Sequence, residues 1–589
     1  MLRVKLLMEY LKEYNDMNLV NKTELRNNKI IYILLMAMLL LSVTLVTVKR
    51  LFFGLDIDEQ YAVTLAYRIA KGDMLLKEIW EPHQTSALIM ALPVWIFIKI
   101  TGGMAYLGLF LRLIGVVIQT LTAILWFLVF KDKCEKVVAL STSFLVFLVL
   151  PKLILSPEFN NMQIWFFIIS VLFIVKGIEK ESKAYIILAG IFLFLEILAY
   201  PTCILVYICF VILMFVLKRK YALILALPAL IGGILLGLFL ALKLGVKDIL
   251  FYLSCVLDDG AHSEGILAKL LGYIKEIPAL LLHLLAFAAL AALACALVKL
   301  ILKEKGLGKR DFYRVITFFN TIAFVHQIVS WLVFKTFIFY PQYAYVTLFI
   351  SGIVVFIRER KELEKGYKYA FLFTYIGNVV ALLSILLLTN LNLKATFIHL
   401  IPADALAVIL ICEMYRRDES LSKDWAHAVI FVFAFIVMLF VNQGVLVRTS
   451  DEGRYKDVFL VRQKALSGPG NKIYAAYMEG YELNEDEVLL SSLVPEGAKV
   501  LYIGNNDFVY MIGDYEIASP SVISTPTFGE NLVKYYEVNP EKIPEYIVVK
   551  KGYLKEEEEE FVGDWMESSF ETEEIGENEF ALVYRILNS

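Results

Sequence analysis

The chain has 589 residues, of which 59% are hydrophobic and only 20% are charged. An average soluble protein has about 25% charged and about 45–50% apolar residues, so this composition excludes a single water-soluble core. The apolar residues come in runs of roughly 17–25, the length that a helix needs to cross a hydrocarbon layer about 30 Å thick. The sequence therefore predicts an all-α polytopic membrane domain.

The net charge of −3 conceals two differently built parts. Residues 451–589 are strongly acidic and contain no cysteine, whereas the hydrophobic part before them is basic and holds all six cysteines. No cysteine pair has the spacing of a metal site. We expect a cytoplasmic N-terminal segment at 1–29, a membrane domain at 30–444 and a soluble, extracytoplasmic α/β domain at 445–589.

The first apolar run, Ile30–Val48, follows a polar, basic segment, which favours an uncleaved span with its N-terminus inside. Later apolar segments alternate with basic connections, which the positive-inside rule places in the cytoplasm. This alternation predicts about 13 transmembrane helices, a first outer loop at 49–85 and a long outer loop at 245–276. Residues 86–101 do not fit the alternation of inner and outer connections, and we expect this apolar segment to be tilted or only partly embedded in the membrane. The basic connections are Lys131–Lys136, Lys176–Lys183, Lys218–Lys220, Lys299–Arg310, Arg358–Lys368 and Arg416–Lys423.

The acidic C-terminal part has the pattern of a small α/β domain. Short β-branched or aromatic runs at Val500–Ile503, Tyr546–Val549 and Phe580–Ile586 alternate with polar segments that contain Gly and Pro. Glu556–Glu560 is typical of a solvated helix face or a loop. The residues around Gly504 lack the glycine pattern of a dinucleotide-binding loop.

The first outer loop carries three carboxylates within four positions, namely Asp56, Asp58 and Glu59. From Glu59 to Lys71 apolar residues recur at helical spacing, so we expect an amphipathic helix at the membrane surface. Asp58 lies at or near the N-cap of that helix. An aspartate before a helix caps it more often than it catalyses a reaction. Both interpretations of Asp58, as a helix cap and as a catalytic group, therefore stay open.

Several short motifs follow one another after the first span. The chain has an Asp58-Glu59 pair, a helix that ends in Gly72-Asp73, a Glu81-Pro82-His83 element and then Pro93-Val94-Trp95. This order of motifs resembles the C-type glycosyltransferases. Within that superfamily it is most similar to relatives of protein O-mannosyltransferases and of the lipid A aminoarabinose transferase. The usual Pro-Pro pair is here Pro82-His83. Further similar positions within residues 30–360 are Phe110–Leu113, Ser156–Glu158, Tyr200–Thr202 and Tyr340–Tyr343.

This resemblance implies an enzyme that moves a sugar from a polyprenyl-phosphate carrier to a hydroxyl of a glycan, lipid or protein, with inversion, at the outer membrane face. It implies Asp58 as the general base, with Asp56 as the second choice. A carboxylate within hydrogen-bond reach is needed to accept the proton of a poorly nucleophilic hydroxyl. Glu59, Glu81, His83 and Glu158 would orient the acceptor or bind a divalent cation.

The departing phosphate needs cations near the outer face. Arg112 and Lys335 border apolar helices, where a charge is costly and is usually paired or functional, although either side chain could instead snorkel to the interface. Lys247 and Lys269 lie in the long outer loop and are further candidates for the carrier phosphate. The six histidines show no His-x-x-x-His spacing, so the sequence contains no local metal motif. A divalent cation nevertheless stays a possible cofactor.

Two other functions fit the composition. A lipid or sugar transporter or flippase would be polytopic, but transporters place ionisable residues near the bilayer midplane, whereas this acidic cluster lies outside the spans. A non-catalytic cell-envelope assembly protein would use the C-terminal domain for binding. In each case we expect a multi-pass plasma-membrane protein, of bacterial type, with the lipid bilayer as a partner and without a nucleic-acid partner.

Overall fold

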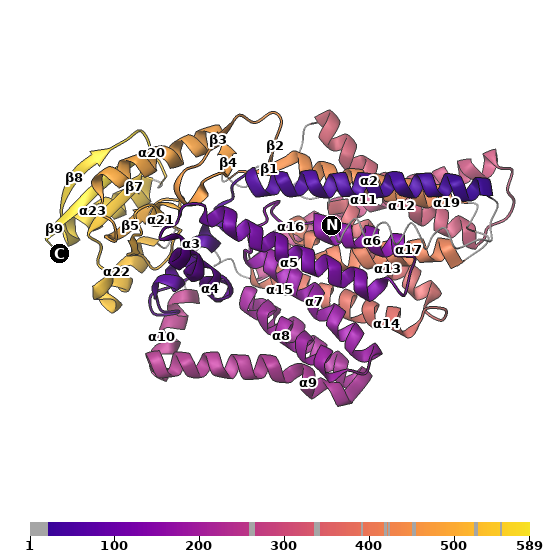
Figure 1. Ribbon diagram of the computed structural model, residues 1–589, viewed down its shortest axis with the longest axis horizontal. Helices are drawn as coiled ribbons and strands as arrows, with labels where there is room; N and C mark the ends of the chain where they lie inside the picture. Colours follow the sequence, from indigo (N-terminus) through magenta and orange to yellow (C-terminus); the bar gives the residue numbers. More distant parts are fainter. Residues whose placement is uncertain are drawn as a thin grey trace.

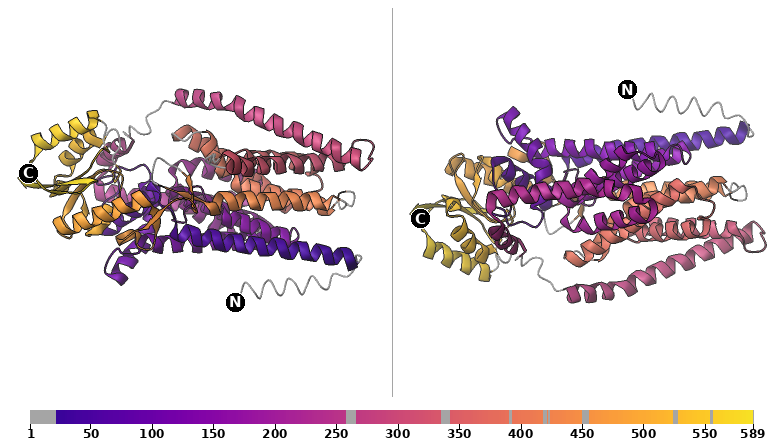
Figure 2. Two further views of the ribbon diagram at one scale, coloured as in Figure 1. Left: turned by 90° about the horizontal axis from the view of Figure 1, so that it is seen from above. Right: turned by 90° about the horizontal axis from the view of Figure 1, so that it is seen from below.

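A computed structural model describes residues 22–257, 266–334, 342–389, 393–417, 421, 424–449, 455–523, 528–553 and 556–588. Long helices run side by side, and a small domain of strands and helices covers one end of them (Figures 1 and 2). The all-α body and the C-terminal α/β domain expected from the sequence are both confirmed.

The helical body contains long helices and several short connecting ones. The main helices are α2 (Lys22–Phe52), α3 (Ile57–Lys71), α4 (Gln84–Thr101), α5 (Leu107–Phe130), α6 (Lys136–Leu148), α7 (Phe159–Glu179), α8 (Lys183–Ala199), α9 (Ile204–Leu244), α10 (Val246–Leu257), α11 (Ile266–Ile301), α12 (Lys309–Phe334), α13 (Gln342–Glu359), α14 (Lys365–Phe371), α15 (Gly377–Leu388), α17 (Ile401–Arg417) and α19 (Trp425–Phe440). Short helical turns at Pro201–Cys203, Leu372–Ile376, Leu393–Thr396, Phe397–Leu400 and Val441–Val445 connect them.

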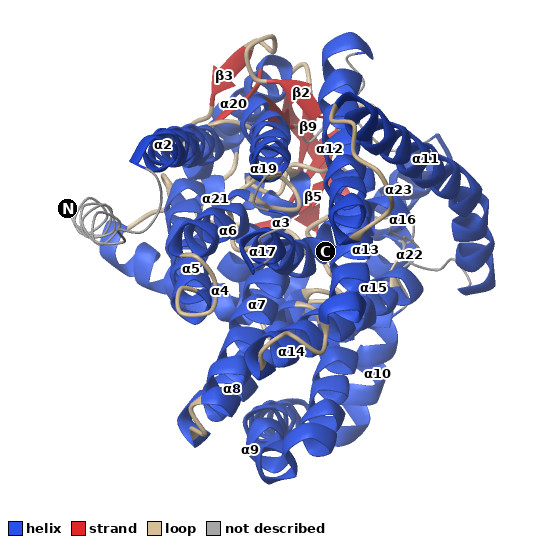
Figure 3. Ribbon diagram, turned by 90° about the vertical axis from the view of Figure 1, so that its right-hand side faces the viewer, coloured by secondary structure: helices blue, strands red, loops and turns tan. Residues whose placement is uncertain are grey.

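The burial pattern divides the helices into a centre and a lipid-facing rim. Ten helices in the described part are long and apolar enough to cross a membrane, and α4 is among them. Helices α7 and α17 are buried almost throughout and stand in the middle of the end-on view (Figure 3). Helices α9 and α11 expose many large apolar side chains, such as Leu223, Leu235 and Leu282. Such a surface is stable only against lipid. The number of crossings stays a prediction.

Helix α9 contains two of the expected spans. Its backbone leaves the helical region at Lys218, where φ is −149° and ψ is 64°, so two helices meet there in a kink. This position lies in the basic connection Lys218–Lys220, at which the sequence predicted a loop. The two apolar segments on either side agree with the prediction.

The C-terminal domain is built on a five-stranded sheet in the order β6-β5-β7-β9-β8. Strand β5 (Lys499–Ile503) is parallel to β6 (Glu516–Ile517) and β7 (Tyr546–Lys550), whereas β9 (Ala581–Asn588) is antiparallel to β7 and β8 (Glu571–Glu577). Helices α20 (Tyr477–Leu493), α21 (Val509–Ile512), α22 (Phe528–Val538) and α23 (Glu556–Ser569) accompany it. The three strands expected from the sequence are β5, β7 and β9. Two small hairpins, β1 (Leu446–Arg448) with β2 (Tyr455–Asp457) and β3 (Gln463–Ala465) with β4 (Tyr474–Ala476), precede the sheet.

Residues 49–85 hold the C-terminal domain in place. The hydroxyl of Tyr67 donates to the carbonyl of Tyr515 at 2.8 Å, and the backbone N–H of Trp80 donates to the carbonyl of Pro520 at 2.9 Å. The indole of Trp80 also packs edge-on against Tyr535. Residues more than 400 positions apart in the sequence are therefore in direct contact at this end of the bundle.

Candidate functional site

Helix α3 begins two residues earlier than the sequence predicted. Asp56, and not Asp58, is its N-cap, because the Asp56 carboxylate accepts a hydrogen bond from the backbone N–H of Asp58 at 2.7 Å. The cap was misplaced because either aspartate satisfies the capping pattern in sequence. Asp58 lies in the first turn of the helix, where its side chain is free of the cap and the helix dipole stabilises its negative charge.

Asp56 also pairs with a cation that follows the last helix of the helical body. Its carboxylate contacts the guanidinium of Arg448 in β1, and only 1% of the Asp56 side chain is exposed. The backbone N–H of Leu55 donates to the carbonyl of Arg448 at 3.2 Å. Gly54 precedes this contact with φ of +89°, and a Cβ atom there would lie 3.0 Å from the same carbonyl oxygen. The chain therefore needs glycine to bring α3 against β1.

Asp58 forms an ion pair with Lys152, which lies in the loop between α6 and α7. The Asp58 side chain is 25% exposed and that of Lys152 is 13% exposed. The Lys152 ammonium also lies 4.8 Å from the centre of the Phe159 ring. Burial lowers the pKa of Lys152, and the negative charges of Glu158 and Asp56 oppose that shift. Asp58 and Lys152 thus form a partly open pair of opposite charges.

Glu158 is the N-cap of α7. Its carboxylate accepts hydrogen bonds from the backbone N–H groups of Asn160 at 2.9 Å and Asn161 at 2.7 Å. Burial raises the pKa of Glu158, whereas Lys152 and the two backbone donors lower it. Glu158 contributes its charge to the site but is held by the helix end that it caps.

Arg112 and Glu59 form a buried ion pair with each other and do not face an open site. The guanidinium of Arg112 donates to both oxygens of Glu59, at 2.7 and 2.5 Å, and to the backbone carbonyls of Arg50, Leu51 and Gly54. All five N–H bonds of the guanidinium are thereby used. The predicted role of Arg112 in phosphate binding conflicts with this arrangement, because a phosphate would have to replace partners that fix the end of α2 to α3.

His83 joins this cluster through the ring of Phe159, whereas Glu81 is held by the C-terminal domain. Glu81 is 4% exposed and accepts a hydrogen bond from the backbone N–H of Val522, in the C-terminal domain, at 2.8 Å. Burial raises its pKa, and hydrogen bonds from the side chains of Ser521 and Tyr61 oppose the shift. The His83 ring stacks on Phe159 with ring centres 4.0 Å apart. His83 and Lys152 therefore both contact the Phe159 ring.

Two of the remaining predicted cations lie elsewhere in the helical body. Lys247 is an exposed residue of α10, Lys269 is buried in α11, and Lys335 lies outside the described residues. Lys152 was not predicted as a site residue from the sequence; it stands at the end of an apolar run, between Pro151 and Leu153. A cation at such a boundary is the signal by which Lys152 could have been found.

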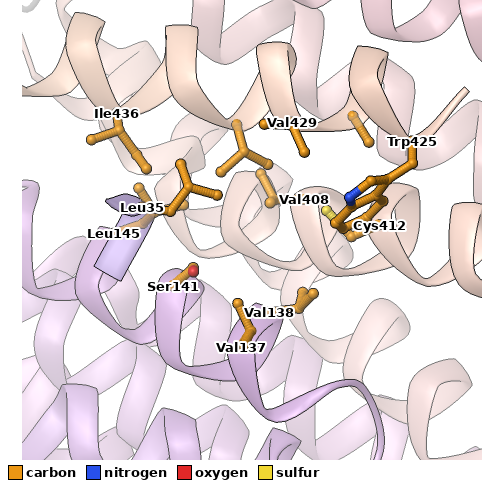
Figure 4. A pocket seen from close by; sticks show the side chains of 12 residues that line it. Leu35, Val137, Val138, Ser141, Leu145, Val408, Cys412, Trp425, Val429 and Ile436 are labelled. Atoms are coloured by element: carbon orange, nitrogen blue, oxygen red, sulfur yellow. The ribbon is translucent and has the colours of Figure 1, made fainter. Parts of the chain in front are cut away.

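Within the described part of the chain, no group of three or more His, Cys, Asp and Glu residues could hold a metal ion. His262 lies outside the described residues, and His399 contacts Gln163 at 2.9 Å. An apolar pocket opens between α2, α6, α17 and α19 (Figure 4). Leu35, Val138, Val408 and Trp425 are among its lining residues, which places it away from the charged cluster and among the apolar helices.

No protein-family model matches the sequence, and no curated protein sequence matches it. The structure is similar to that of ArnT from Cupriavidus metallidurans in the apo state, with 10% sequence identity and a TM-score of 0.43, over 93% of this chain and 97% of that chain. It is also similar to the same protein bound to undecaprenyl phosphate, with 10% identity and a TM-score of 0.36, over 94% and 97% of the two chains.

Proposed function

We propose that the protein is an integral-membrane glycosyltransferase that moves a sugar from a polyprenyl-phosphate carrier to a hydroxyl acceptor. The observation that carries this proposal is the partly exposed pair of Asp58 and Lys152 at the end of the helical body. A carboxylate can accept the proton of an acceptor hydroxyl, and a neighbouring cation can hold a phosphate. The apolar rim keeps a lipid-linked donor within reach of that pair.

Asp58 is the proposed general base, and Asp56 is not, because the two carboxylates have different surroundings. Asp56 is buried, caps α3 and pairs with Arg448, whereas the Asp58 side chain is the more exposed of the two. One carboxylate and one displacement at the anomeric carbon give inversion of configuration. Glu81, His83 and Glu158 form the surroundings in which the acceptor would be oriented.

The proposal is tested with purified protein in detergent, an undecaprenyl-phosphate-linked sugar and a mixture of hydroxyl acceptors (a glycan, a lipid and a protein), by measuring release of undecaprenyl phosphate. We expect release by the unchanged protein and a loss of about 10²–10⁴-fold in Asp58→Asn, the usual contribution of a general base. The control is Asp514→Asn, which removes an exposed carboxylate that pairs with Lys71 on the surface. Full transfer by Asp58→Asn contradicts the assignment of the base, and loss in Asp56→Asn alone transfers that role to Asp56.

A transporter is the second candidate, and Asp404 is the observation that favours it. Asp404 lies in the first turn of α17, is 2% exposed, and has no hydrogen-bond partner among the described residues for either carboxylate oxygen. An ionisable side chain inside a membrane protein often marks a transport path. Movement of a labelled lipid-linked sugar across proteoliposomes, without release of its lipid phosphate, supports transport instead of transfer.

A further inference from the structure

Three ion pairs involve the short segment Asp56–Glu59, and they differ in how much of their side chains is exposed to solvent. Glu59 with Arg112 is fully buried, and Asp56 with Arg448 is nearly so. Asp58 with Lys152 is the most exposed of the three. The cations come from α5, from β1 and from the loop between α6 and α7, so the site is assembled from separate parts of the chain.

The partners of Lys152 make it suited to exchange one anion for another. Its ammonium is a compact charge on a flexible stem, unlike the planar, fully occupied guanidinium of Arg112. Glu158 is engaged with the N-terminus of α7, and Asp56 is engaged with α3 and Arg448. Asp58 is therefore the partner that Lys152 can release without breaking a helix cap.

The charges also explain why the pair must open before the reaction. A carboxylate held by an ammonium is a poorer proton acceptor than a free one, because the positive charge stabilises its ionised form. The leaving phosphate gains a negative charge as the sugar departs, and a cation that contacts it at that stage stabilises the transition state. One lysine meets both demands if it changes partner.

We propose that Lys152 binds the phosphate of the lipid carrier, and that this phosphate and Asp58 compete for its ammonium. This inference rests on the proposed function. In the transfer step the acceptor oxygen bonds to the anomeric carbon as the bond from that carbon to the phosphate oxygen breaks, and the bonding pair stays on the phosphate. The acceptor proton passes to Asp58, which Lys152 has released. Sugar transfer thus begins only when the donor is in place.

The experiment measures equilibrium binding of undecaprenyl phosphate by the purified full chain in detergent micelles. We expect Lys152→Gln to weaken binding by about tenfold or more, since it removes a charge-assisted contact. Asp58→Asn strengthens binding several-fold, because the competing carboxylate is gone. Lys243→Gln, which changes an exposed lysine in the last turn of α9, is the matched control and leaves binding unchanged. Inorganic phosphate in a parallel arm shows whether the free anion competes or the lipid is required.

Competition makes the two variants move in opposite directions, which a merely structural role of Lys152 does not produce. Unchanged binding in Lys152→Gln, or weaker binding in Asp58→Asn, overturns the inference. Lys152→Arg keeps the charge and restores part of the affinity, which separates loss of the contact from loss of the fold. Binding that follows this pattern without any sugar transfer contradicts the proposed function but not the phosphate site. Absence of binding by the unchanged protein overturns both.

Discussion

The guanidinium of Arg112 and the carboxylate of Glu59 form a two-pronged ion pair that joins α5 to α3, with N–O distances of 2.7 and 2.5 Å. Neither side chain reaches solvent, since Arg112 is 0% and Glu59 is 1% exposed. Because Glu59 follows Asp58 directly, this pair fixes the first turn of α3 on which the proposed base stands.

Removing one member of that pair leaves the other charge buried. We expect Arg112→Met to lower the free energy of unfolding by about 3–5 kcal/mol, the cost of an uncompensated buried ion. The double variant Glu59→Gln/Arg112→Met loses less stability than the single variant, because neither charge remains. Thermal unfolding in detergent measures the stability of the two variants. Lys71→Met, which breaks the exposed pair with Asp514, is the control and changes stability by about 1 kcal/mol or less.

Gly115 in α5 is predicted to control the position of the loop that carries Lys152 and Glu158. A Cβ atom at Gly115 would lie 1.7 Å from the carbonyl oxygen of Leu155, which is a backbone atom and cannot rotate away. Gly115→Ala therefore displaces this loop and lowers both sugar transfer and lipid-phosphate binding. Gly233→Ala in α9 meets nothing within 4 Å. If both alanine variants behave alike, the loop is not held by Gly115.

Asp507 is predicted to make the stability of the protein depend on pH. It is fully buried, neither carboxylate oxygen has a hydrogen-bond partner among the described residues, and burial followed by the charge of Glu81 raises its pKa well above the usual value. The folded state therefore binds the proton more tightly than the unfolded state, and stability falls as pH rises above about 4, the usual carboxyl pKa.

Asp507→Asn removes this ionisation and raises the unfolding temperature at pH 7, and the gain shrinks as pH falls towards 4. Unfolding in detergent at several pH values between 4 and 8 measures it. Asp514→Asn, on the surface, keeps the slope of the unchanged protein. A gain that is the same at every pH assigns the effect to packing rather than to ionisation.

Arg448 couples the C-terminal part of the chain to the proposed base. Arg448→Met leaves the Asp56 carboxylate buried without its cation, and we expect α3 to lose its fixed start and transfer to fall. Asp56→Asn/Arg448→Met recovers part of the activity, because asparagine also caps helices and carries no charge. Transfer rates and unfolding temperatures of the two variants distinguish this coupling from a simple loss of folding.

Local patterns were sufficient for much of the architecture. The apolar runs predicted the helical body, and β-branched runs predicted β5, β7 and β9, since these signals depend on neighbouring residues along the chain. The helix after the first span was also expected, although its cap is Asp56 and not Asp58. That error arose because the two aspartates are equivalent in pattern and differ only in backbone conformation and partners.

The charged cluster shows what the sequence determined and what it did not. The sequence by itself determined that this is a membrane protein with an acidic group of side chains beside its first span, because hydrophobic length and local charge can be read from one segment. Only the tertiary structure decided which cation meets which carboxylate. Arg112, Lys152 and Arg448 stand 53, 94 and 392 positions from Glu59, Asp58 and Asp56 in the chain. Folding brings these partners together because a buried charge is stable only beside its counter-charge.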